Sequence, residues 1–352
     1  MNENRRPLLR DVARKAGVSI TTVSIVLNGK AGSNIPPETR GRVVAAAAEL
    51  GYRPNAMARG LRQRRSETIG FLSDEIATTP FAGAMIQGAQ DAAWESGIVL
   101  LLVNTGRDRD IEARALDIMH ERRVDGLIYA TMYHQVVDPP AALREVPSVL
   151  LDARARDLSL ASVVPDEVNA ARRAVQILLV RGHRRIGFVN TTDRVPAAFE
   201  RLDGFRSALA EHGIAFDASL VAAGEGSDPA TGELAAARLL DLADRPTGLF
   251  CFNDRMAMGA YRAIRRRGLR VPEDVSVVGF DNEEQIAPWL EPPLTTLALP
   301  HYQMGRWAVE YLLTQASASG SSTEPLQYRM PCPLIERSSV AANGPAVGAV
   351  ES

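Results

Sequence analysis

The sequence has few cysteines and no long apolar run. Its 352 residues include two cysteines, Cys251 and Cys332, which make neither a metal-ligand cluster nor a disulfide framework. No uninterrupted apolar stretch approaches the roughly 18 residues that a membrane-spanning helix needs. Residues 1–10 lack the apolar segment of a secretory signal. We therefore expect a cytoplasmic protein with reduced thiols, no metal site and no membrane partner.

Catalytic signatures are also missing. The sequence contains no Gly-x-Ser-x-Gly nucleophile turn, no phosphate loop with Gly-Lys-Ser/Thr and no His-Glu-x-x-His. Gly224-Glu225-Gly226 lacks the third glycine of a dinucleotide fingerprint, and the five histidines form no cluster along the chain. These absences favour a binding protein without a cofactor over an enzyme. A catalytic cluster assembled only in the fold remains the alternative.

The charge is unevenly distributed. A hydrophobic content of 46% excludes wholesale disorder, and the length predicts two or three domains. Residues 1–66 hold 13 basic and four acidic residues, a charge of +9, whereas the remainder holds 27 basic and 38 acidic residues, a charge of −11. A basic N-terminal segment, residues 1–66, followed by an acidic remainder favours a polyanion as the partner of the N-terminal segment alone. A solvated basic arm without a partner is the alternative.

Residues 8–50 predict three short helices. In the first, apolar residues recur at i, i+3, i+4 and i+7 from Leu9, and Gly17 then breaks the helix. Ser19 is a candidate N-cap for a second helix that ends near Leu27. Pro36 takes the capping place of the third, and Gly51 suits its end. We expect residues 1–51 to form a helix-turn-helix headpiece.

Residues 52–66 are expected to form a hinge helix and a charged linker. Pro54 disfavours helix in the residue before it, and Asn55 could cap a very short helix that ends at Leu61. A helix of this length is marginal alone in water and needs a partner surface.

From Thr68 onward, short apolar runs alternate with helical stretches. This pattern predicts an α/β body, residues 67–339, with parallel sheets covered by helices on both faces and divided into two lobes. A poorly ordered tail is expected over residues 340–352. The expected strands are Thr68–Ser73, Ile98–Val103, Gly126–Ala130, Ser148–Leu151, Arg185–Asn190, Gly248–Phe252 and Val275–Phe280. The expected helices are Phe81–Ser96, Ile111–Arg122, Glu167–Val180, Phe199–His212, Gly232–Ala243, Arg255–Arg267 and Tyr302–Leu313.

The second helix of the headpiece has a polar outer face that could enter a major groove. Its serine, threonine and asparagine side chains can hydrogen-bond phosphates, which positions a protein on DNA. Its apolar outward side chains can contact thymine methyl groups. The candidate DNA contacts on this element are Ser19, Ile20, Thr21, Thr22, Ser24, Ile25 and Asn28. A helical corner without DNA-binding function is the alternative.

Several strings of residues, in order and spacing, closely resemble the lactose-repressor (LacI/GalR) family. The resemblance covers residues 8–339. The strings are Leu9-Arg10-Asp11-Val12-Ala13-Arg14-Lys15-Ala16-Gly17-Val18-Ser19, Thr22-Val23-Ser24, Val26-Leu27-Asn28-Gly29, Glu49-Leu50-Gly51-Tyr52-Arg53-Pro54-Asn55, Val124-Asp125-Gly126-Leu127-Ile128, Gly182-His183-Arg184-Arg185-Ile186, Arg201-Leu202-Asp203-Gly204-Phe205, Phe252-Asn253-Asp254, Val278-Gly279-Phe280-Asp281, Pro293-Leu294-Thr295-Thr296-Leu297 and Leu334-Ile335-Glu336-Arg337-Ser338.

The resemblance implies a dimeric repressor that reads a pseudo-palindromic operator and controls genes of carbohydrate uptake or breakdown. It implies that the short helix after Pro54 forms on DNA and lies in the minor groove. Leu61 would wedge into the central base step, with Asn55 and Ala58 on the same element. Residues 340–352 show no leucine heptad, so we expect a homodimer and no tetramer.

The resemblance also implies a small sugar-like effector in the cleft between two lobes, as in periplasmic sugar-binding proteins. Each of the candidate contacts is expected to follow a strand or to open a helix, where open α/β sheets bind ligands. They are Phe81, Arg201, Asn253, Asp254 and Asp281, with Asp74, Asp152 and Asp166 as further candidates. For each acid, a helix cap or a solvated loop residue is the alternative.

Three positions depart from the family pattern. Ile25 stands where the family usually has an arginine, and it cannot make the bidentate contact with guanine that an arginine makes. Pro36 replaces a serine cap. Thr79-Pro80-Phe81 replaces Asn-Pro-Phe. A DNA-binding regulator controlled by a protein or non-sugar corepressor therefore stays open, as do a sugar-binding protein and an enzyme built on the same body.

Replacing Leu61 with alanine removes the expected wedge. Operator affinity should fall about tenfold or more in a gel-shift or fluorescence-anisotropy titration, because the kinked DNA loses its intercalated side chain. The thermal unfolding of the body should not change. Unchanged operator affinity in Leu61→Ala would contradict the wedge.

Overall fold

The computed structural model describes residues 7–27, 34–53, 65–75, 80–317 and 324–343. It divides the chain into two units, Met1–Glu67 and Thr68–Ser352. Within these ranges, none of the helices combines the length and hydropathy that crossing a bilayer requires.

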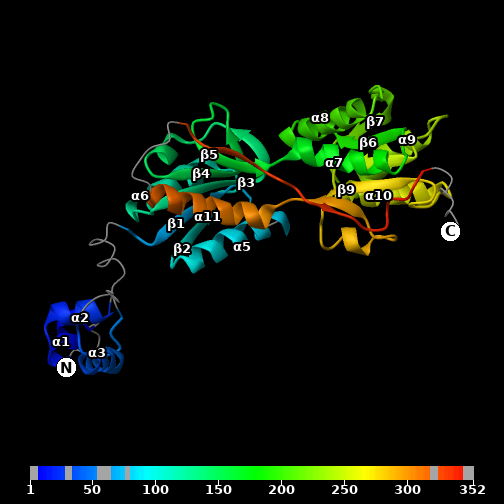
Figure 1. Ribbon diagram of the computed structural model, residues 1–352. Coiled ribbons are helices and arrows are strands. Elements are labelled where there is room, and N and C mark those ends of the chain that lie inside the picture. The colour runs from blue at the N-terminus through cyan, green and yellow to red at the C-terminus, as the bar shows by residue number, and fades with distance from the viewer. Residues whose placement is uncertain (1–6, 28–33, 54–64, 76–79, 318–323, 344–352) are drawn as a thin grey trace, which may run out of the picture. The chain divides into compact units, whose positions relative to one another are not determined.

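The described part of the first unit contains three helices (Figure 1), which enclose a small apolar core. They are α1 (Leu9–Ala16), α2 (Ile20–Leu27) and α3 (Pro37–Glu49), which confirms the predicted helices. Val12, Val23 and Val43 are fully buried between them. Gly17 has a φ of 67°, which turns the chain between α1 and α2. Ser19 Oγ accepts a hydrogen bond from Thr22 N at 3.0 Å, the cap expected for α2.

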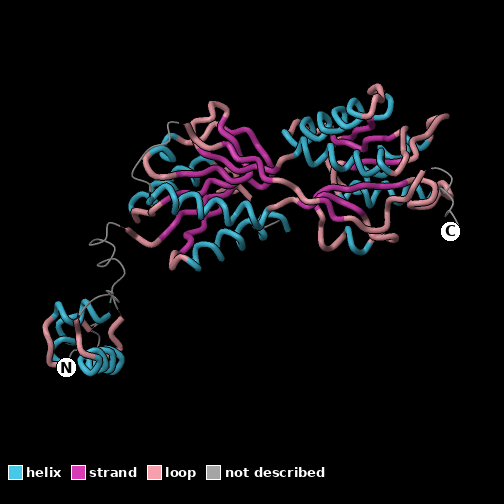
Figure 2. Tube along the Cα trace, in the orientation of Figure 1, coloured by secondary structure: helices cyan, strands magenta, loops and turns pink. Residues whose placement is uncertain are grey.

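The second unit is built on two six-stranded sheets, one in each lobe (Figure 2). The first has the order β11-β5-β4-β3-β1-β2 and the second β12-β10-β9-β8-β6-β7. The paired strands run parallel except β10 and β12, which are antiparallel. The strands are β1 (Thr68–Ser73), β2 (Val99–Asn104), β3 (Gly126–Val137), β4 (Ser148–Ala155), β5 (Ala161–Pro165), β6 (Ile186–Thr191), β7 (Val221–Gly224), β8 (Gly248–Cys251), β9 (Ser276–Asp281), β10 (Thr295–Ala298), β11 (Gln327–Met330) and β12 (Leu334–Ile335). The predicted two-lobed α/β body is confirmed.

In the described residues of the second unit, seven α-helices cover the faces of the two sheets (Figure 1). They are α5 (Pro80–Glu95), α6 (Arg109–Glu121), α7 (Glu167–Val180), α8 (Pro196–Glu211), α9 (Pro229–Leu240), α10 (Asp254–Arg266) and α11 (His301–Ser317). Short 3₁₀ turns lie at Ala141–Arg144, Ala218–Leu220 and Ala287–Trp289. The chain passes between the lobes from β5 to α7, from β10 to α11 and from β11 to β12. These crossings bring α11, late in the sequence, beside α5 in the first lobe.

Glycines let three pairs of helices approach closely. A Cβ at Gly88 of α5 would overlap the Tyr302 carbonyl of α11, and one at Gly204 of α8 would overlap the Val168 carbonyl of α7. Likewise, a Cβ at Gly259 of α10 would overlap backbone of α9. The backbones themselves are therefore the packing surface at these three contacts.

The structure adds strands that the pattern does not predict. β5 ends in a proline, β7 is rich in alanine and glycine, and β12 has two residues, so none has the β-branched run that marks a strand. The ordered chain also continues past 339. The carbonyl of Ala341 is hydrogen-bonded to His183 Nε2 at 3.1 Å, and Asn343 N donates to Arg181 O at 2.7 Å. Residues 344–352 of the expected tail lie outside the described residues.

Replacing Gly88 with alanine should destabilise the second unit by about 1–3 kcal/mol, because the methyl group has no room against α11. Gly83 in the same helix has open space around it, so Gly83→Ala should be neutral or stabilising by up to about 1 kcal/mol. Urea unfolding of both variants measures the difference. Equal stability of the two would contradict the close approach of α5 and α11.

Candidate functional site

The outer face of α2 carries the side chains expected to contact DNA. Ile20 is 53% exposed, and Ser19 and Thr21 are also exposed, while Val23 and Val26 point into the core. Thr22, Ser24 and Ile25 are half-buried. The first unit thus presents a mixed polar and apolar surface beside a buried stripe, as a groove-reading helix requires. Asn28, Asn55, Ala58 and Leu61 lie outside the described residues.

A cavity of about 590 Å³ lies between the two lobes of the second unit. Its walls come from both sheets and from two of the crossing segments, near Pro165 and near His301. Of the eight residues predicted to contact an effector, four line it: Asp152, Arg201, Asn253 and Asp281. Its remaining lining residues are Met132, Tyr133, His134, Pro165, Glu167, Asp193, Arg194, Val195, Ala197, Ser227, Phe252, Arg255, Leu299 and His301.

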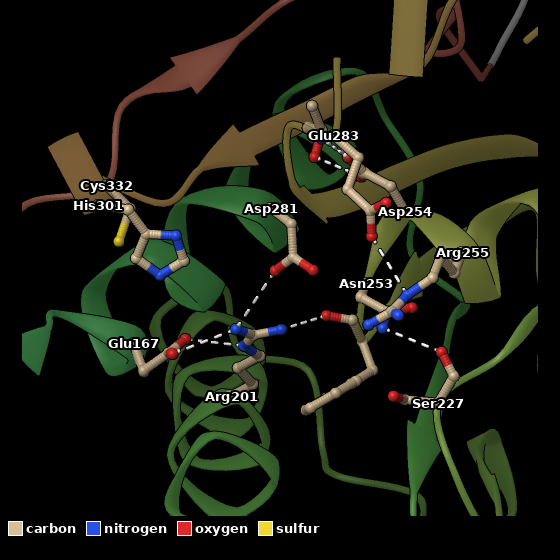
Figure 3. Close-up of polar contacts among 12 residues, drawn as sticks. Glu167, Arg201, Ser227, Asn253, Asp254, Arg255, Asp281, Glu283, His301 and Cys332 are labelled. Atoms are coloured by element: carbon tan, nitrogen blue, oxygen red, sulfur yellow. Dashed lines mark hydrogen bonds and ion pairs between the residues drawn. The ribbon is translucent and has the colours of Figure 1, made fainter. Parts of the chain in front are cut away.

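Arg201 is the centre of a buried ion cluster (Figure 3). It extends from α8 and is 3% exposed. Its Nε and Nη2 donate to the two carboxylate oxygens of Glu167 at 2.7 and 3.1 Å, and its Nη1 donates to the Phe252 carbonyl. Nη2 also lies 3.7 Å from Asp281 Oδ1. The guanidinium lies over the rings of Phe252 and Phe280, 4.5 and 3.7 Å from their centroids. Arg201 is thereby fixed in one orientation.

Asn253 is tied to the second lobe by hydrogen bonds of its own. Its Oδ1 accepts from Met256 N at 2.8 Å, which caps α10, and its Nδ2 donates to Ser227 O at 3.0 Å. Its side chain therefore shapes the wall of the cavity and has little donor capacity left for a ligand.

The other predicted acids lie outside the cavity lining. Asp254 is fully buried, and its carboxylate accepts from Thr296 Oγ1 at 2.6 Å and Glu283 N at 2.8 Å. Burial raises the pKa of Asp254 to about 7. Asp74 accepts from Met132 N at 3.0 Å, and Asp166 caps α7. For Phe81 the structure describes only its place in α5.

Two of the cavity acids have a backbone conformation that L-residues seldom adopt. Asp152 has a φ of 54° and Asp281 a φ of 104°. The pairing of β3 with β4 is irregular between Ala130 and Gln135, opposite Asp152. Such strain costs about 1–3 kcal/mol per residue and is concentrated at functional sites.

The first-lobe wall contains buried polar atoms without a hydrogen-bond partner. Asp152 is 1% exposed and His134 is 3% exposed, yet Asp152 Oδ1 and both ring nitrogens of His134 are unpaired. Burial lowers the pKa of His134, so its imidazole is neutral at pH 7. Unpaired buried polar groups are costly, and in a cavity they indicate a missing ligand or water.

Glu167, His134 and His301 are cavity residues that the sequence did not single out. Glu167 begins α7 directly after β5, and β5 itself was not expected, so no strand end marked this position. His134 lies in the irregular part of β3, which extends well past the predicted strand. The one available signal was that Glu167 follows Asp166, already a candidate.

Comparison with known proteins gives consistent matches over both units. Residues 8–55 match the family described as bacterial regulatory proteins, lacI family, and residues 175–340 match the periplasmic binding protein-like domain. The transcriptional repressor CytR of Escherichia coli K12 is 35% identical over 340 residues, 95% of this chain and 96% of CytR. The repressor PurR of Vibrio atlanticus is 32% identical, covering 94% of this chain and 98% of PurR.

Solved structures agree with these matches. The Lac repressor dimer bound to operator and the anti-inducer ONPF has 29% sequence identity and a TM-score of 0.77, covering 96% of this chain and all of the other. The complex of the transcriptional regulator CelR with cellobiose has 32% identity and a TM-score of 0.64, covering 95% of this chain and all of the other.

Replacing Glu167 with glutamine should destabilise the second unit by about 3–5 kcal/mol, because it removes the carboxylate that Arg201 holds in a buried pair. Glu211 pairs with Arg172 between the same two helices, but this pair is exposed. Glu211→Gln should therefore cost less than about 1 kcal/mol. Urea unfolding at pH 7 compares the two variants. A loss in Glu167→Gln no larger than in Glu211→Gln would mean that the buried pair is not needed.

Proposed function

The chain belongs to the lacI family of bacterial regulatory proteins, and we propose that it is a transcriptional repressor controlled by a small polar effector. It binds a two-fold symmetric operator as a homodimer, with α2 in the major groove. The effector is a sugar or sugar derivative held between the lobes of the second unit. The target genes serve carbohydrate uptake or breakdown.

The observation that carries the effector assignment is the set of unpaired polar atoms on Asp152 and His134 in the cavity between the lobes. A volume of about 590 Å³ suits a small molecule. Hydroxyl groups could donate to Asp152 and either donate to or accept from His134, while Phe252 and Leu299 supply apolar contact. The complex of CelR with cellobiose supports the same class of ligand, since that relative shares the fold.

The homodimer is supported by apolar side chains on the surface of the first lobe. Trp94 is 77% exposed, and Val99 and Leu102 on the edge strand β2 are 60% and 40% exposed. An uncovered edge strand with apolar side chains favours a partner surface. The related Lac repressor structure is a dimer on its operator, so a second copy of this chain is the proposed partner.

A protein corepressor is the weaker alternative. A protein surface could cover exposed apolar residues, but it would leave the buried polar atoms of the cavity unpaired. Those atoms therefore favour a small molecule over a protein as the effector.

Selection of bound fragments from genomic DNA, followed by footprinting, tests the DNA-binding function. Full-length protein should protect a pseudo-palindromic site. Affinity should fall steeply between 50 and 200 mM salt, by about 10³-fold for six phosphate contacts. Sequence-independent binding, or a flat salt response, would contradict the proposal.

Arg201→Lys should separate effector response from operator binding. Lysine keeps the positive charge beside Glu167 and Asp281. It loses the planar guanidinium, whose hydrogen bonds to Glu167 and the Phe252 carbonyl fix the cavity wall. We expect effector affinity, measured by operator release, to weaken about 10- to 100-fold while operator affinity without effector is unchanged. Arg206→Ala, an exposed change in the same helix, is the control. A wild-type response in Arg201→Lys would move the effector site elsewhere.

A further inference from the structure

The cavity is lined by more buried carboxyl groups than buried cations. The side chains of Asp152, Glu167 and Asp281 are 2%, 2% and 7% exposed, and the one deeply buried cation among the described lining residues is Arg201. The other two lining arginines do not compensate this excess. Arg255 pairs with Glu283 at 3.2 Å, and Arg194 is exposed at the surface. An excess of buried carboxylates is costly unless a cation or a proton neutralises it.

Arg201 is already committed to two of these carboxylates. Glu167 accepts from Nε and Nη2 of Arg201 in a bidentate pair, and Asp281 Oδ1 lies 3.7 Å from the same Nη2 (Figure 3). The Phe252 and Phe280 rings bracket the guanidinium and hold it in the second lobe. No ion pair between Arg201 and Asp152 is found among the described residues, and the charge of Arg201 acts on that carboxyl group only at longer range.

Among the described residues, the imidazole of His301 lies within ion-pair distance of the Asp152 carboxyl group. His301 Nε2 lies 3.9 Å from Asp152 Oδ2, and burial together with Arg201 lowers the pKa of His301 to about 4, so the ring is neutral at pH 7. Burial, then the charge of Glu167, raises the pKa of Asp152 well above its usual value. The other charges that act on Asp152 are Arg201, which opposes this rise, and Asp74, which adds to it. This shift favours the protonated form of Asp152, and a cation beside its carboxyl group would favour the charged form.

We propose that the effector carries a protonated amine that pairs with the unpartnered carboxylate oxygen of Asp152, so that it is an amino-substituted polyol and not a neutral sugar. This inference rests on the proposed function and specifies the ligand of the same cavity. The ammonium group supplies the missing positive charge and donates to Asp152 Oδ1. Hydroxyl groups on the same ring or chain would reach His134, which can both donate and accept.

Matched sets of compounds test whether the effector is a cation. Isothermal titration of the full-length protein compares D-glucosamine with D-glucose and N-acetyl-D-glucosamine, and D-galactosamine with D-galactose and N-acetyl-D-galactosamine. At least one free amine should bind tenfold or more tightly than both of its neutral partners. Its binding should release up to one proton, measured from heats in two buffers of different ionisation enthalpy, as Asp152 ionises.

The variant Asp152→Asn tests whether Asp152 causes the tighter binding of the amine. Asparagine tolerates the positive φ of this position, so the variant should fold and should bind the amine no more tightly than its neutral partners. Asp138→Asn is the matched control: it removes one carboxylate from the same lobe, but its side chain is 75% exposed. The control should keep the preference and the proton release.

Two results would overturn the proposal. One is that no amine in the panel binds more tightly than its neutral partners, and the other is that Asp152→Asn retains the preference. If neutral sugars bind and release operator, the proposed function stands and only the cationic effector fails. If nothing in the panel binds while the operator footprint persists, the sugar-like effector fails together with this inference and the DNA-binding function stands. If Asp152→Asn does not fold, the proposal is tested by the wild-type protein alone, through its affinities for each amine and its neutral partners and through its proton release.

Discussion

The buried ion pair between Arg201 and Glu167 is the interaction on which the cavity depends. It joins the first turn of α7 to the middle of α8, and Asp281 at the end of β9 completes it. Three elements of the second lobe therefore meet at one guanidinium. Removing charged groups from water costs several kcal/mol per ion, and a role of the fixed charges in ligand binding would account for that cost. The strained backbone at Asp281 is consistent with that reading.

The body combines rigid lobes with a small number of connections. Within each lobe, glycines bring helix backbones into direct contact, which leaves little freedom for the helices to slide. Between the lobes, the chain passes at β5–α7, β10–α11 and β11–β12, and two of these passages contribute Pro165 and His301 to the cavity. Arg329 of β11 also pairs with Glu200 of α8 at 2.8 and 3.1 Å, across the two lobes. A ligand between the lobes is thus placed to alter their relative angle, the two-state element that effector control needs.

Much of this could be predicted from the sequence, because the signals are local. Apolar spacing from Leu9 gives α1. Arg201 lies in a helix that the sequence predicts, and Asn253 and Asp281 come at the ends of strands whose apolar runs are clear. The features that could not be predicted depend on the direction in which a side chain points and on irregular pairing between strands. Asn253 and Asp254 are neighbours, yet one caps α10 at the cavity while the other points toward β10. Glu167 and His134 were missed because β5 has no β-branched run of strand length and β3 departs from regular register.

Amide hydrogen exchange of the full-length protein, with and without a compound that releases it from operator, tests the effector site most directly. The account predicts protection in segments of both lobes that line the cavity: residues 131–134 and 152–155 in the first lobe, and 193–201 and 252–255 in the second. Protection confined to one lobe, or to surfaces away from these segments, would contradict a site built around Arg201 and Asp152.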